Sequence, residues 1–289
     1  MFQSASDAAL RLSLRHVPGR REWRGACPSC GYNDSFMLSE KNGRAFGWCA
    51  SCQDRDGIAR LLRSDAPLPD AHRDPARDAE KGRQLEHARA QALRIWNGAE
   101  PAAGTPADLY LTSRGLPGLA ASAALRFRRD CWDTEGGRRP ALVALVVDAA
   151  GEPMSVHRTF LTPTGEKADC EPVKASKGPV WGGAIRLDPA APELVIGEGI
   201  ETSASAGRLI GLPAWAAVSA GNLARGLVLP AEVRCVIVAA DADEPGERAA
   251  REAALRWQRE GRTVRIARPD VAGYDFNDVL RAGVAEVQP

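Results

Sequence analysis

Two aspartates directly follow an apolar run in the last third of the chain. Residues 236–240 have the length and composition of a buried strand, and Asp241 and Asp243 come immediately after them. Pro245 and Gly246 then open an alanine-rich stretch, which predicts a helix. Because open α/β sheets bind their ligands at the carboxyl ends of their strands, this stretch predicts two carboxylates at a functional site.

A second apolar run of the same kind, residues 193–197, ends at Glu198. Carboxylates at the ends of two parallel strands of one sheet can converge. Oxygen ligands of this type suit Mg²⁺, which leaves its remaining positions to water and phosphate. Glu198, Asp241 and Asp243 are therefore the predicted catalytic carboxylates. For Asp243 an alternative stays open, because a residue at this place also serves as the N-cap of the next helix.

The segment Tyr274-Asp-Phe-Asn-Asp278 follows the last predicted strand and brings two more carboxylates toward the same edge. We include Asp278 in the predicted magnesium site. The alternative is that Asp275 or Asn277 only caps the final helix.

Strand and helix patterns alternate through residues 191–289, which indicates a parallel sheet covered by helices. The expected elements are strands at 193–197, 214–218, 233–240 and 263–268, and helices at about 200–210, 247–260 and from 276.

Four of the seven cysteines form two Cys-x-x-Cys pairs, Cys27 with Cys30 and Cys49 with Cys52. Two such pairs at this separation predict a closed, structural Zn²⁺ site of the zinc-ribbon type. A redox pair and buried free thiols are the alternatives.

A β-hairpin is expected between the two cysteine pairs, with strands at 35–39 and 44–48 and a turn at Asn42-Gly43. Its aromatic residues would either stack on single-stranded bases or form the small core of the ribbon; they are Phe36, Phe46 and Trp48. Residues 2–17 ahead of it read as an amphipathic helix with Ala9, Leu12 and also Leu10 and Val17 inside.

Residues 64–82 are rich in proline and charge and predict a flexible linker. A helix over 83–97 and an antiparallel sheet follow in residues 83–190, with strands expected at 141–147 and 155–161. Basic residues on or beside this sheet could hold triphosphate or template backbone, although surface lysines are the ordinary alternative. They are Arg158, Lys167, Lys174 and Lys177.

The composition is that of packed globular domains, with 44% hydrophobic residues among 289 and a formal net charge of +1. Lys and Arg are in excess over residues 1–63, whereas Asp and Glu are in excess over 191–289. A basic front half and an acidic site suit an enzyme that handles a polyanion. The sequence shows neither a signal peptide nor a membrane span, so a soluble, cytoplasmic protein is expected.

The acidic segments resemble those of the Toprim domain, which is shared by bacterial and phage primases, topoisomerases and some nucleases. Together with the four-cysteine ribbon, they make the chain similar to primases of phage or plasmid (mobile-element) type. Segments of the middle block are similar to those that such primases carry before Toprim: Tyr110-Leu-Thr-Ser-Arg-Gly-Leu116, His157-Arg-Thr-Phe-Leu161, Gly165-Glu-Lys167 and Gly182-Gly-Ala-Ile-Arg-Leu187.

The resemblance implies a multidomain α/β protein: a zinc ribbon over 1–63, the linker 64–82, a mixed α+β subdomain over 83–190 and a Rossmann-like Toprim domain over 191–289. It further implies synthesis of short RNA primers in DNA replication. The substrates would be a single-stranded DNA template and ribonucleoside triphosphates, and Mg²⁺ or Mn²⁺ would bind at Glu198, Asp241 and Asp243.

Two departures from the resemblance matter. The family often has an aspartate three residues past the glutamate, where this chain has Glu201 and then Thr202. No Gly-x-x-x-x-Gly-Lys-Ser/Thr loop is present, so a replicative helicase would be a separate partner. Two rival functions therefore remain: a Toprim nuclease that activates water, and a non-catalytic module that binds single-stranded DNA.

Overall fold

The computed structural model describes residues 4–29, 34–41, 44–49, 55–63, 75–241, 243–270 and 273–283. The chain divides into two compact units, Met1–Arg83 and Gln84–Pro289. Within the described ranges, no helix combines the length and the apolar character that a membrane crossing requires.

The amino-terminal unit is built on an antiparallel sheet in the order β1-β2-β3-β4. The predicted hairpin is confirmed, because β3 and β4 pair antiparallel and Phe36 lies opposite Cys49. The elements are α1 (Ala5–Arg11), β1 (Arg15–His16), β2 (Glu22–Gly25), β3 (Phe36–Lys41), β4 (Arg44–Cys49) and α2 (Arg55–Arg63).

Helix α1 is shorter than predicted, and its inward face is confirmed in part, since Ala9 is buried and Leu12 packs against the core of this unit. It begins after Ser4, whose side chain accepts a hydrogen bond from the Asp7 amide, and it buries Ala5, Ala8 and Ala9. Leu10 is 83% exposed, so its predicted inward position is wrong. Small alanines allow the helix to lie close to the sheet. This close packing outweighs the hydrophobic gain from burying Leu10.

The three aromatic residues of the hairpin differ in burial. Phe36 is fully buried in the core of this unit, whereas Phe46 and Trp48 are 52% and 45% exposed. Cys27 and Cys49 are buried in the same core. Cys30, Cys52 and the Asn42-Gly43 turn lie outside the described residues, so the zinc site stays a prediction.

Helix α3 (Pro75–Asn97) starts within the stretch predicted as a linker. Its first turns, Pro-Ala-Arg-Asp-Ala-Glu-Lys-Gly, carry no large apolar side chain, which is why the hydrophobic pattern places the helix start later. Residues 64–74 are outside the described residues.

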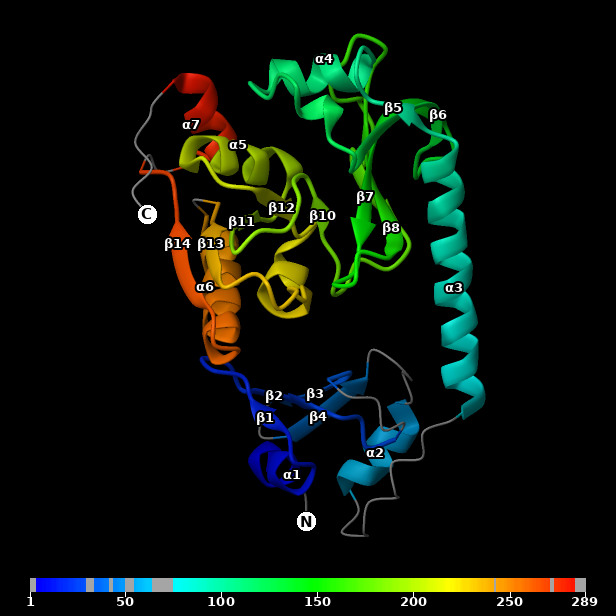
Figure 1. Ribbon diagram of the computed structural model, residues 1–289. Helices are drawn as coiled ribbons and strands as arrows, with labels where there is room; N and C mark the ends of the chain where they lie inside the picture. Colours follow the sequence, from blue (N-terminus) through cyan, green and yellow to red (C-terminus); the bar gives the residue numbers. More distant parts are fainter. Residues whose placement is uncertain are drawn as a thin grey trace. The chain divides into compact units, whose positions relative to one another are not determined.

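A five-stranded antiparallel sheet, in the order β5-β6-β7-β8-β9, forms the middle of the chain (Figure 1). Strand β7 alternates strictly: Ala141 and Val143 pack with α3 residues Ala92 and Trp96, whereas Leu142, Ala144 and Val146 face a different cluster. The elements are β5 (Glu100–Pro101), α4 (Pro106–Ser113), η1 (Leu119–Ala121), β6 (Leu125–Trp132), β7 (Arg138–Val147), β8 (Pro153–Phe160) and β9 (Lys174–Lys177).

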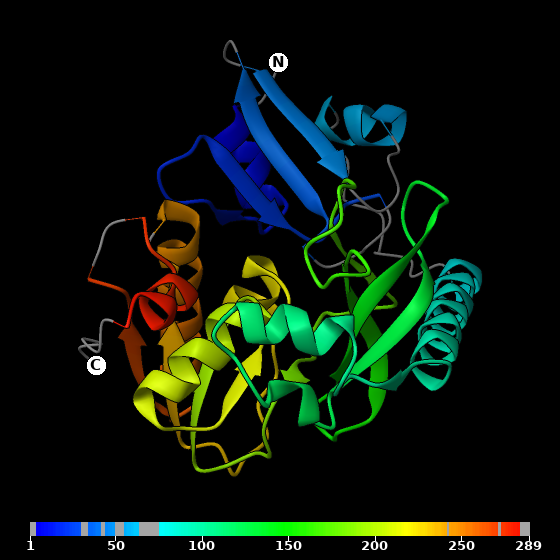
Figure 2. The same ribbon diagram turned by 90° about the horizontal axis from the view of Figure 1, so that it is seen from above.

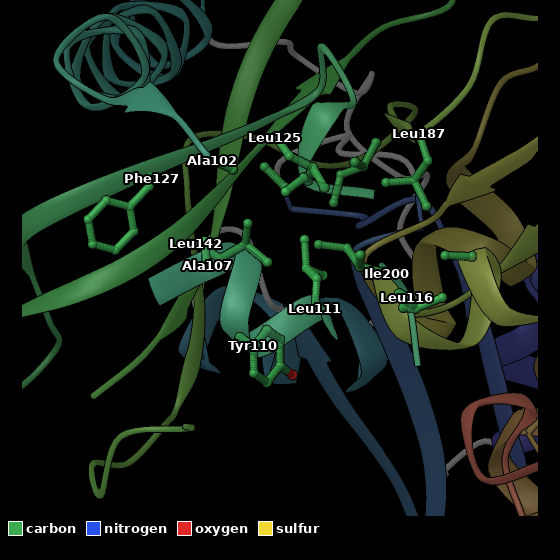
Figure 3. Packing of buried hydrophobic residues seen from close by; sticks show 14 of the residues in the cluster. Ala102, Ala107, Tyr110, Leu111, Leu116, Leu125, Phe127, Leu142, Leu187 and Ile200 are labelled. Carbon is green, nitrogen blue, oxygen red and sulfur yellow. The ribbon is translucent and has the colours of Figure 1, made fainter. Parts of the chain in front are cut away.

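The second cluster joins the middle sheet to the last third of the chain. Figure 3 shows Tyr110 and Leu111 from α4, Leu142 from the sheet and Ile200 from the carboxy-terminal segment in one packed group. All four are at most 4% exposed. The middle sheet and the carboxy-terminal sheet therefore share a core, and side chains from α4 reach the predicted site.

The carboxy-terminal sheet has the order β10-β12-β11-β13-β14. Its last four strands run parallel, and β10 pairs antiparallel with β12 at one edge. The predicted α/β class and parallel sheet are confirmed. The elements are β10 (Ile185–Arg186), β11 (Glu193–Gly197), α5 (Ile200–Ile210), β12 (Ala214–Ala216), η2 (Asn222–Gly226), β13 (Cys235–Ala239), α6 (Glu244–Arg259), β14 (Thr263–Ala267) and α7 (Phe276–Ala282).

Helices cover both faces of this sheet. Trp257 and the alanines of α6 pack with Val236 and Val238 on one face. Ala206 of α5 and Phe276 of α7 pack with Ile237 on the other face. Figure 2 shows α5 and α7 side by side, and the two helices are in contact. The three-layer arrangement leaves the carboxyl edge of the strands for a site.

Candidate active site

The register of two neighbouring strands brings Glu198 and Asp241 to one edge of the sheet. Strands β11 and β13 pair in parallel, with Gly197 opposite Ala239, so the next residues of both strands leave the sheet together. At Gly197 a Cβ would come within 2.7 Å of the Ser203 hydroxyl, so the close approach of α5 requires glycine there. The packing of α5 against Gly197 therefore fixes the position of Glu198, the first residue after β11.

Glu198 and Asp241 line a pocket of about 240 Å³. Its wall mixes acidic and basic side chains from both sheets and from α4, α5 and α7. The lining residues are Arg114, Lys167, Lys174, Glu198, Gly199, Glu201, Thr202, Asp241, Asp275 and Asn277.

The two strand-end carboxylates are destabilised as anions. Burial raises the pKa of Glu198, and the negative charges of Asp241 and Asp243 raise it further. Burial also raises the pKa of Asp241, and the charges of Asp275 and Asp243 add to this effect. A site with partly buried, mutually repelling carboxylates gains most from a cation.

Asp243 and Asp278 have structural partners. Asp243 Oδ1 accepts a hydrogen bond from the Gly246 amide at 2.7 Å and is the N-cap of α6. Asp275 and Asp278 form a capping box at the start of α7. Asp275 lines the pocket and Asp278 does not belong to the described lining, so Asp275 is the better placed member of this pair.

The donor set fits a hard divalent cation. Glu198, Asp241 and Asp275 offer carboxylate oxygens to one pocket, and Mg²⁺ typically takes one or two protein carboxylates with water and substrate phosphates completing its shell. Among the residues that the structure describes, no group of three or more His, Cys, Asp and Glu side chains is arranged to hold a metal ion.

Glu201 is a pocket residue to which sequence reasoning assigned no role. It accepts hydrogen bonds from the Tyr110 hydroxyl and from Lys174 Nζ, the latter at 2.9 Å. Burial alone would raise the pKa of Glu201, but the ammonium of Lys174 and the two hydrogen bonds lower it to about 2. Glu201 is therefore ionised throughout the neutral range and forms a true ion pair with Lys174.

The cationic side of the pocket comes from the middle block. Burial lowers the pKa of Lys167, and the nearby charge of Lys174 lowers it further. Arg114, the C-cap of α4, places its guanidinium over the Tyr110 ring, 5.5 Å from the ring centre. Arg114, Lys167 and Lys174 thus line the same pocket as the carboxylates, which suits a ligand that carries several negative charges.

Arg158 and Lys177 are placed differently from the other predicted basic residues. Arg158 is 6% exposed, and its guanidinium donates to the carbonyls of Trp132 and Ala175. It faces α3 and not the pocket, since it lies in register with Val143. Lys177, at the end of β9, is absent from the lining that the described residues form.

Two pocket-side residues, Tyr110 and Arg114, were not predicted as site residues. They lie in segment 110–116, which the sequence analysis noted only for its similarity to primases. Tyr110 and Arg114 are four residues apart on α4 and its C-cap, hence on one helical face. Asn277 Nδ2 donates to the Arg114 carbonyl at 2.6 Å and to Ser205 Oγ at 3.0 Å, which ties α4 to α7 and α5. The sequence shows the four-residue spacing of Tyr110 and Arg114, but it does not show that Asn277 contacts Arg114.

A larger pocket of about 320 Å³ lies beside η1 and β12. Its charged residues are occupied by the backbone: Asp188 accepts from the Ala214 amide, and Arg208 donates to the Gly115 carbonyl. The smaller pocket is the candidate site, because carboxylates and cations line it together.

Comparison with protein families matches residues 193–286 to the family described as Toprim domain. This segment is a Toprim domain. Residues 86–187 match a family described as a domain of unknown function, DUF7146. The Toprim match covers α5, α6, α7 and the four parallel strands, so Glu198 and Asp241 lie at the carboxyl edge of a Toprim sheet.

Solved structures similar to this chain include three primase fragments. A DNA primase domain from Pseudomonas aeruginosa is 18% identical, with a TM-score of 0.48 over 68% of this chain and 74% of that one. The primase fragment of the bacteriophage T7 primase-helicase is 17% identical, with a TM-score of 0.44 over 90% and 94%. The zinc-binding and RNA polymerase domains of the Aquifex aeolicus primase are 14% identical, with a TM-score of 0.49 over 98% and 81%.

Proposed function

We propose that this chain is a DNA primase, which makes short RNA primers on single-stranded DNA from ribonucleoside triphosphates. One observation carries the proposal: Glu198 and Asp241, at the strand ends of a Toprim domain, line one pocket with the cations Arg114, Lys167 and Lys174. A nucleoside triphosphate brought to a divalent cation needs this combination of acidic and basic groups.

Glu198 and Asp241 would hold Mg²⁺ or Mn²⁺, and Asp275 lies within the same lining. The bound cation would lower the pKa of the primer 3′-hydroxyl and neutralise charge on the triphosphate. Lys167, Lys174 and Arg114 would bind the phosphate oxygens and stabilise the pyrophosphate that leaves. Asp243 caps α6 and so fixes the turn that carries Asp241.

The proposal extends to the other predicted partners. The ribbon would retain the single-stranded template, with Phe46 and Trp48 as exposed stacking surfaces. A separate replicative helicase would act with the protein in the DNA replication of a phage or other mobile element, in the cytoplasm.

A priming assay tests the function directly. The full-length protein is incubated with single-stranded DNA of varied sequence, labelled ribonucleotides and either Mg²⁺ or Mn²⁺. We expect short labelled products, and we expect Asp241→Ala and Glu198→Gln to lose at least about a hundredfold in rate. Glu252→Gln, which disturbs an exposed ion pair with Arg225, is the matched control and should keep activity.

The same assay separates the rivals. End-labelled template that shortens in the absence of nucleotides would identify a nuclease. Template binding without any product, with either metal, would identify a non-catalytic module and refute the primase.

A further inference from the structure

A buried network connects three elements that are far apart in the sequence. Tyr110 of α4 and Lys174 of β9 both bond to Glu201 in the first turn of α5, one to each carboxylate oxygen. Tyr110 is 1% exposed and belongs to the shared core in Figure 3. Glu201 is therefore held at one oxygen by the core residue Tyr110 and at the other by Lys174, a residue of the pocket lining.

The two members of the ion pair differ in exposure. The side chain of Glu201 is 12% exposed, whereas that of Lys174 is 32% exposed and lines the pocket. An ammonium has three donors, and the bond to Glu201 uses one. Among the described residues, Glu201 is the hydrogen-bond acceptor of this ammonium, so the pair holds a cation at the pocket with further donors for an incoming ligand.

The charge of Lys174 reaches several other residues in and near the pocket. Its charge acts on Glu198 and on Asp241, the two proposed metal ligands, and also on Lys167 and His157. The ion pair gives this ammonium Glu201 as its counter-ion, which is neither of the two proposed metal ligands.

We propose that Glu201 is a positioning residue: with Tyr110 it fixes the Lys174 ammonium to receive the β- and γ-phosphates of a nucleoside triphosphate. The inference rests on the proposed function for its ligand class, but it concerns binding and not polymerisation. A residue that only stabilised the fold would affect all ligands of the pocket alike. A residue that positions Lys174 discriminates between a triphosphate and a monophosphate.

The test measures binding of Mg²⁺-ATP and of AMP to the full-length protein by calorimetry. We expect Glu201→Gln and Lys174→Gln each to weaken ATP binding about tenfold, the effect of losing one charge-assisted contact, with AMP affinity changed less than about twofold. Because both substitutions disable the same contact, the double variant should lose no more than either one. Tyr110→Phe keeps the ring in the core but removes the hydroxyl that holds Glu201, so it should also weaken ATP binding.

Asp133→Asn is the matched control, because it removes a buried carboxylate that pairs with Arg139 at 2.7 Å and does not line the pocket. It should lower the melting temperature and leave ATP affinity unchanged. The inference is overturned if Glu201→Gln binds ATP like the wild type, if ATP and AMP lose affinity equally, if the two losses add, or if the wild-type protein does not bind ATP. ATP binding with this pattern but without primer synthesis would refute the primase and uphold the role of Glu201.

Discussion

Thr202 donates a hydrogen bond from its hydroxyl to Asp241 Oδ1 at 3.3 Å, which ties the first turn of α5 to the end of β13. This bond favours the ionised form of Asp241 and lowers its pKa, against burial and the charge of Asp275, which raise it. A neutral side chain thus helps to keep a proposed metal ligand charged.

Thr202→Val keeps the shape of the side chain and removes this donor. The pKa of Asp241 should rise further, so the carboxylate should be protonated at higher pH and bind Mg²⁺ less well there. The measurement is the rise in melting temperature on adding Mg²⁺, followed from pH 5 to pH 8. We expect the midpoint of this rise to move to higher pH in the variant. Thr164→Val, on an exposed turn, is the control and should follow the wild type.

Glu198 should make the fold less stable as pH increases. Its pKa is raised in the folded state, so the folded protein binds the proton more tightly than the unfolded chain and loses stability between the ordinary and the raised pKa. Glu198→Gln should therefore raise the melting temperature by a few degrees at pH 7 in the presence of a chelator. Below about pH 4 the gain should vanish. A gain that persists at low pH would point to packing instead of charge.

Glu201 should behave in the opposite way. Its pKa is lowered to about 2, so its contribution to stability is present above the ordinary glutamate value and is lost as pH falls toward 2. Glu201→Gln should lower the melting temperature at pH 7, and the difference from wild type should shrink between about pH 4.5 and pH 2. Equal responses of the two glutamine variants would contradict the assigned charge environments.

The Toprim sheet could be predicted closely because its signals are local. Apolar runs bounded by turns and a helical period locate β11 and α5 at the residues expected, 193–197 and 200–210. Strand β10 was missed, since two residues at a sheet edge have no period of their own and need β12 as partner.

The sequence predicts the carboxylates of the site but not the contacts of Glu201. Glu198 and Asp241 come from adjacent strands of one sheet, so topology alone brings them together. Tyr110 and Lys174 reach Glu201 from 91 and 27 residues away, and such contacts depend on how the two sheets share a core. The burial of individual side chains could not be predicted either. In the sequence Arg158 is a candidate nucleic-acid contact, but in the structure it is buried.

Arg158 should matter for stability and not for template binding. Its guanidinium satisfies the carbonyls of Trp132 and Ala175 and lies over the Phe160 ring. Arg158→Ala should lower the free energy of unfolding by roughly 2–3 kcal/mol, because buried hydrogen bonds from a charged group are lost. Urea unfolding measures this change, and the affinity for a single-stranded oligonucleotide should stay within about twofold of wild type. A large loss of affinity without loss of stability would restore the nucleic-acid role.

The four cysteines of the predicted ribbon, Cys27, Cys30, Cys49 and Cys52, should hold about one Zn²⁺ per chain. Cys27 and Cys49 belong to one buried cluster with Phe36 and Ile58, so a loop residue that follows β2 and the last residue of β4 meet in the same small core. Cys49→Ser should release the metal, measured by atomic emission, and should unfold the amino-terminal unit, because a core of this size depends on its metal. Cys131→Ser, a buried cysteine of the middle sheet, should retain full zinc content. Unchanged zinc in Cys49→Ser would show that the metal is bound elsewhere.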